Sequence, residues 1–187
     1  MSFTIDLIDE ATRPKAPRIE GATWQQRMHG RRLAMIHKLH LAQMAQVRAV
    51  MDEVAAGEAG ADRLGEALSS MQMARNYRAF GNLCGQECRM LTFHHTAEDR
   101  MVFPALASAG DEGLRKVIER LAEEHLVIHR LIEEMEGAAL DAMNAPGPET
   151  FTRLREAFET LERVVKSHFG YEQEQLEEAI GYYGIEM

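Results

Sequence analysis

Apolar residues recur with the period of an α-helix along most of the chain, and no stretch alternates as a half-buried strand does. Short polar connectors interrupt the period, among them "GEAGAD" and "NAPGPE", which contain the glycine and proline typical of loops. Four long amphipathic helices joined by short loops are typical of an up-down-up-down bundle. We therefore predict an all-α four-helix bundle, with helices over about residues 23–56, 63–103, 111–143 and 149–181.

Capping residues and helix breakers suggest where the predicted helices begin and end. Thr23 is a candidate N-cap of the first helix, and Gly57 is expected to end that helix. Pro104 is expected to end the second helix, because proline removes a backbone donor. A helix of roughly 40 residues would be unusually long. We therefore expect a bend near residues 71–75, which would leave a short extra helix at about 63–72.

The first 22 residues show no periodic pattern. They contain Pro14, Pro17 and Gly21 among charged side chains, a composition typical of irregular backbone. We predict an irregular N-terminal arm over residues 1–22 and a single bundle domain over residues 23–187.

The composition restricts the classes of partner. A formal net charge of −9 disfavours nucleic acid, whose phosphates would be repelled. No apolar run approaches the roughly 18 residues of a membrane span, and the N-terminus lacks a signal-peptide pattern. Cys84 and Cys88 lie one helical turn apart on one face, which suits a redox pair or core packing; the geometry is poor for a disulfide, which favours core packing. We expect a cytoplasmic protein without nucleic-acid or membrane partners.

Each predicted helix places histidine on its apolar face. A single example usually indicates a hydrogen-bonded core histidine. Repetition on four helices requires a common partner, because isolated buried charges are costly. The histidines concerned are His37 and His40 on the first helix, His94 on the second, His125 and His129 on the third, and His168 on the fourth.

Two glutamates share these faces. Glu98 follows His94 by four residues, and Glu172 follows His168 by four residues, so each pair lies on one side of its helix. Imidazole and carboxylate donors without cysteine suit iron, manganese or zinc. Two carboxylates that can bridge favour a dinuclear centre, with two iron ions as the first choice.

Other polar residues of the second helix stand closer to the edge of its apolar face. With His94 at 0°, the face is centred near 40–60°, which places His95 at the edge and Asp99 beyond it. Glu87 lies on the buried face two turns before His94 and is a candidate partner for Arg48 or a ligand histidine. The position of Tyr77 suits either the core or a hydrogen bond to a ligand.

Four segments carry a resemblance to a known family. "LAMIHKLHLAQM", "HHTAEDRMVFPAL", "RLAEEHLVIHRL" and "HFGYEQEQLEEA" resemble, in this order, the four helices of the hemerythrin-like (HHE cation-binding) domain family. The resemblance covers about residues 30–180. It implies a four-helix bundle around a non-haem di-iron centre, with carboxylate and oxo or hydroxo bridges and with manganese or zinc as substitute ions.

The resemblance also implies a ligand set. His37 corresponds best to the first family histidine, with His40 as the alternative. His129 is either a ligand or a neighbour of one, and His95, Asp99, Glu87 and Tyr77 are alternative ligands or hydrogen-bonding neighbours. The implied metal ligands are His37, His94, Glu98, His125, His129, His168 and Glu172, with the two glutamates bridging.

The implied function is binding or reduction of a small diatomic or peroxidic ligand, such as oxygen, nitric oxide or hydrogen peroxide, at an open iron position. The resemblance leaves open whether the protein turns over peroxide or nitric oxide as an enzyme or only binds its ligand. Two alternatives remain, an iron-handling or sensing module without turnover and a bundle that binds zinc structurally.

Overall fold

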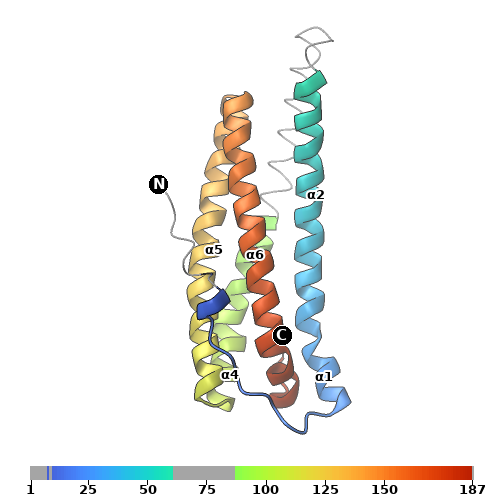
Figure 1. The fold of residues 1–187 in the computed structure, drawn as a ribbon, viewed down its shortest axis with the longest axis vertical. Coiled ribbons are helices and arrows are strands. Elements are labelled where there is room, and N and C mark those ends of the chain that lie inside the picture. The colour runs from blue at the N-terminus through green and yellow to red at the C-terminus, as the bar shows by residue number, and fades with distance from the viewer. Residues whose placement is uncertain (1–7, 9, 61–86, 187) are drawn as a thin grey trace. The chain divides into compact units, whose positions relative to one another are not determined.

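The computed structural model describes residue 8, residues 10–60 and residues 87–186, and every regular element in these ranges is helical (Figure 1). This confirms the all-α class, whereas the up-down order stays a prediction. None of the described helices combines the length and apolar character needed to cross a bilayer. The predicted helix at 63–72, the bend at 71–75, Tyr77 and Cys84 lie outside the described residues.

The elements are the 3₁₀ turn η2 (Glu10–Thr12), α1 (Trp24–Gly30), α2 (Arg32–Gly60), a helix over 87–97, the π-helical turn η4 (Glu98–Val102), α4 (Phe103–Ala109), α5 (Glu112–Asn144) and α6 (Pro148–Tyr183).

The first predicted helix is two helices in the structure. Thr23 caps α1 as expected, since its hydroxyl accepts the Gln26 N–H while the Gln26 side chain accepts the Thr23 N–H. Helix α2 then starts at Arg32 and continues to Gly60, so the expected stop at Gly57 is wrong. A glycine within a helix costs only about 1 kcal/mol relative to alanine, which continued helical hydrogen bonding can offset.

The second predicted helix does not end at Pro104. The backbone N–H of Phe103 donates to the Glu98 carbonyl five residues earlier, which makes a π-helical turn inside the helix. Pro104 falls in the first turn of α4, where its missing N–H is tolerated. The helix therefore continues to Ala109 and ends before Gly110.

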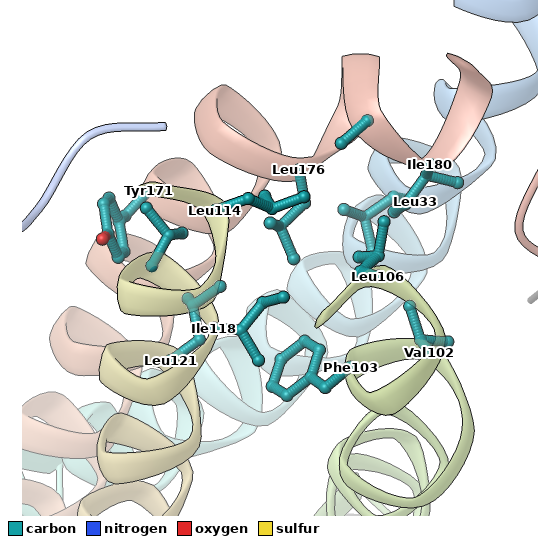
Figure 2. Packing of buried hydrophobic residues seen from close by; sticks show 12 residues of the cluster. Leu33, Val102, Phe103, Leu106, Leu114, Ile118, Leu121, Tyr171, Leu176 and Ile180 are labelled. Carbon is teal, nitrogen blue, oxygen red and sulfur yellow. The ribbon is translucent and has the colours of Figure 1, made fainter. Parts of the chain in front are cut away.

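The chain divides into two compact units. The first contains residues 1–39, 92–129 and 163–187, and the second contains residues 40–91 and 130–162. The core of the first unit is a cluster in which aliphatic and aromatic side chains from α2, η4, α4, α5 and α6 point toward one another (Figure 2). Its members are Leu33, Val102, Phe103, Leu106, Leu114, Val117, Ile118, Leu121, Tyr171, Leu176, Ala179 and Ile180.

The described part of the N-terminal arm belongs to the first unit. Ala16 and Ile19 pack against the apolar cluster, and the Ala16 N–H donates to Gln175 on α6 at 2.8 Å. The Tyr171 hydroxyl donates to the Pro14 carbonyl, also at 2.8 Å. These hydrogen bonds use backbone groups of the arm that have no partner in a helix or sheet, and they hold the arm against α6.

Candidate metal centre

Four of the expected ligands converge in the first unit. His37 from α2, His94 from the helix 87–97, Glu98 from η4 and Glu172 from α6 are all buried, and one donor atom from each lies within 4.8 Å of the others. The Nε2 atoms of His37 and His94 are 3.2 Å apart. We call this group the first cluster. It contains two imidazoles and two carboxylates.

A second cluster in the same unit contains three imidazoles. His95, His125 and His168 are fully buried, and their donor atoms also lie within 4.8 Å of one another. The Nε2 atoms of His125 and His168 are 3.1 Å apart. The ring of His95 stacks on that of His125, with centroids 4.0 Å apart.

The two glutamates of the first cluster also face the second cluster. Glu98 places Oε1 3.3 Å from His94 Nε2 and Oε2 3.6 Å from His125 Nε2. Glu172 Oε2 lies 3.2 Å from His37 Nε2 and 3.7 Å from His168 Nε2. Each carboxylate therefore faces one imidazole of the first cluster and one imidazole of the second cluster.

Several donor atoms of the clusters lack hydrogen bonds within the described residues. They are both ring nitrogens of His95, Oε2 of Glu98 and both carboxylate oxygens of Glu172, all of them buried. Buried polar atoms are normally satisfied, so orphaned ones call for another partner. Cations at the two clusters would provide that partner, and the nitrogen and oxygen donors fit iron, manganese or zinc.

Three of these histidines are held through the ring nitrogen that faces away from the clusters. His168 Nδ1 donates to Glu124 at 3.0 Å, and His125 Nδ1 donates to Asp99 at 2.9 Å. The third, His37, accepts through Nδ1 from the side-chain amide of Gln173 at 2.8 Å. Such partners fix the orientation of a metal-binding imidazole.

Burial sets the charge of the donors. It lowers the pKa of both His95 and His168, which keeps their nitrogen lone pairs available for a metal. Burial, together with the nearby Glu172, raises the pKa of Glu98 well above its ordinary value. For Glu172, burial favours a higher pKa, but the neighbouring His37 outweighs it and the net pKa is lowered. Of the two carboxyl groups, Glu98 is therefore the one whose pKa favours the protonated form.

Other expected residues lie outside the clusters. His40 and Glu87 belong to the second unit, where His40 Nδ1 donates to Glu87 at 2.7 Å. Glu87 therefore pairs with this histidine and not with Arg48. The ring of His129 is half-buried, with its centroid 5.4 Å from that of His95, and is in neither cluster.

The helical-wheel expectation is wrong for His95. His95 is fully buried, whereas Asp99 is exposed, as expected beyond the edge of the apolar face, and reaches His125 from there. The apolar face predicted for the second helix includes Met101, but in the structure this side chain is 62% exposed. The π-helical turn η4 begins only at Glu98, and its extra residue rotates later side chains, Met101 among them, relative to His94 and His95. A regular wheel drawn through both segments therefore misplaces the buried face at His95.

Glu124 was missed by the sequence reasoning. It is fully buried on α5 and accepts hydrogen bonds from Arg13, Arg120 and His168. Its only sequence signal is its position three residues after the core residue Leu121, on the buried side of the helix. One glutamate in an acidic run gives no stronger indication.

One comparison with known proteins agrees with this helical, histidine-rich centre. No curated protein and no solved structure matches the chain. The family model for the hemerythrin HHE cation-binding domain matches residues 29–180, a range that contains every residue of both clusters. Because this match spans most of the sequence, the chain belongs to the hemerythrin HHE cation-binding domain family.

Proposed function

We propose that the protein binds two iron ions and uses them to bind or reduce a small ligand such as oxygen, nitric oxide or hydrogen peroxide. The observation that carries the proposal is the pair of clusters, in which five imidazoles and two carboxylates converge without sulfur. Iron supplies the electrons that such ligands accept on binding. Manganese and zinc suit the same donors and are the competing ions.

The donors divide unevenly between the two proposed ions. His37 and His94 would hold the first ion, whereas His95, His125 and His168 would hold the second, and both glutamates would bridge. In this assignment His95 replaces His129, because the His95 donor atoms lie with His125 and His168. The ion with fewer imidazoles keeps room for an external ligand, so we place ligand binding at the first cluster.

Aromatic side chains make part of the site apolar. Phe169 stacks on His37 with centroids 3.8 Å apart and planes 5° from parallel. Phe103 stacks on His125 at 5.3 Å. Walls of this kind exclude water and suit a small uncharged ligand such as a diatomic molecule.

Metal analysis combined with absorption spectroscopy tests the proposal. Protein purified aerobically should contain two irons per chain and show iron charge-transfer bands that azide or peroxide perturbs. One zinc per chain with a featureless spectrum would refute the proposal and favour a structural zinc bundle. Rapid transfer of iron to an apo-acceptor would favour an iron-handling role.

Three histidine variants test the assignment of donors. His168→Ala should abolish the dinuclear spectrum, and His95→Ala should lower the iron content and change the bands. His129→Ala is the matched control, since its ring lies near the second cluster but outside it, and it should keep two irons. If His129→Ala instead lowered the iron content and changed the bands, the second ion would be assigned to the wrong histidine.

A further inference from the structure

The N-terminal arm reaches the second cluster through one arginine. Arg13 follows η2 and forms a two-pronged ion pair with Glu124 on α5, with Nε 2.9 Å from Oε1 and Nη2 2.9 Å from Oε2. Only 6% of the Arg13 side chain is exposed, and Glu124 is fully buried. A fork of this kind fixes both oxygens of a carboxylate and is stronger than a single contact.

Glu124 connects that arginine to a proposed ligand. The oxygen that accepts from Arg13 Nη2 also accepts the Nδ1 proton of His168, at 3.0 Å. With its proton held at Nδ1, His168 presents Nε2 to the second cluster. Arg120 also donates to Glu124, with its Nε 3.2 Å from Oε1.

The remaining contacts of Arg13 lie around His168 on α6. Its Nη1 donates to the carbonyl and the hydroxyl of Ser167, at 3.2 and 3.1 Å. Its guanidinium also lies over the ring of Tyr171, 4.6 Å from the centroid. Arg13 therefore touches the residue before His168, the residue three after it, and the carboxylate that orients its ring.

We propose that the N-terminal arm is part of the metal centre, with Arg13 as a positioning residue that holds His168 ready for the second ion through Glu124. The proposal rests on the dinuclear function proposed above. A docked arm should strengthen metal binding at the second cluster, and by reciprocity a bound metal should stabilise the docked arm. The first cluster has no such contact with Arg13 among the described residues.

Stepwise titration with Co²⁺, followed by visible absorption, measures the effect on each ion. Arg13→Met should weaken binding of the second Co²⁺ by about 10- to 100-fold, the range for losing a partner that orients a metal ligand. Binding of the first Co²⁺ should change little. Lys15→Met removes the same charge from an exposed arm position and should bind both ions as wild type does.

Hydrogen exchange over residues 10–17 gives a readout that does not depend on activity. In wild type, exchange in this segment should slow when metal is added, whereas in Arg13→Met it should be fast with or without metal. Arg13→Lys keeps the charge but loses the fork, so it should fall between the two in both measurements. It also serves as the test if Arg13→Met does not fold.

A double-mutant cycle separates the route through Glu124 from a general loss of stability. If Arg13 acts through Glu124, Arg13→Met should add little to the metal-binding defect of Glu124→Gln. Additive defects, wild-type affinity for the second ion in Arg13→Met, or arm exchange that ignores metal would each overturn the proposal. Failure of wild-type protein to bind a pair of ions would instead refute the proposed function.

Discussion

Alanine at Gly181 should make the protein less stable than alanine at an unobstructed position of α6, because α1 and α6 meet at Gly181 without side chains. A Cβ atom on Gly181 would lie 1.9 Å from the Gln26 carbonyl oxygen, and one on Gly30 would lie 1.8 Å from the Glu177 carbonyl oxygen. Ordinary contact begins at 3.4 Å, so the backbones would have to separate by 3.4 − 1.9 = 1.5 Å. The obstructing atom is backbone, so no side-chain rotation relieves the clash.

The expected size follows from two opposed effects. Overpacking costs about 1–3 kcal/mol, while replacing glycine by alanine in a helix contributes about 1 kcal/mol of stability. Gly170→Ala on the same helix isolates the second effect, since no atom lies within 4 Å of its would-be Cβ. Urea unfolding of the metal-free protein should show Gly170→Ala stabilised and Gly181→Ala less stable than that control by about 1–3 kcal/mol. Equal stabilisation of both variants would refute the close approach of α1 and α6.

Two further predictions concern the donors themselves. When a metal takes Nε2 of His37, Nδ1 must carry the proton and Gln173 must accept it through Oε1. Gln173→Leu should therefore weaken Co²⁺ binding by about 10- to 100-fold, whereas Gln173→Glu should preserve it. Equal Co²⁺ affinities of Gln173→Leu and wild type would contradict this role of Gln173. Because the pKa of Glu98 is raised, the folded metal-free protein binds this proton above pH 4.5, where the unfolded chain releases it. The stability of Glu98→Gln relative to wild type, measured by urea unfolding with a chelator, should therefore rise with pH above 4.5, and a flat difference would show that Glu98 is ionised in the fold.

Much of the fold could be predicted because it depends on local patterns. The cap at Thr23 and the spacing of four residues in His94–Glu98 and His168–Glu172 are readable in any helical segment. These patterns were sufficient to locate most of the buried donors in the sequence.

The missed features depend on contacts between distant parts of the chain. Arg13 and Glu124 are 111 residues apart, and neither stands in a motif that predicts the other. Gly30 and Gly181 likewise look like ordinary helical glycines in the sequence, and only the structure shows that the backbones of α1 and α6 approach each other there. The π-helical turn buries Glu98 and Val102 on its inner side. No glycine or charge pattern in the sequence predicts this turn.

The doublet His94–His95 favours two metal positions over one. Consecutive helical residues point about 100° apart, so two adjacent imidazoles cannot easily converge on one ion. Here their rings are 5.5 Å apart and tilted by 41°, and each joins a different cluster. Glu98, one turn later, faces both clusters through its two oxygens. A single helix thus presents a donor to each proposed ion and a carboxylate between them, which a site for one structural zinc would not require.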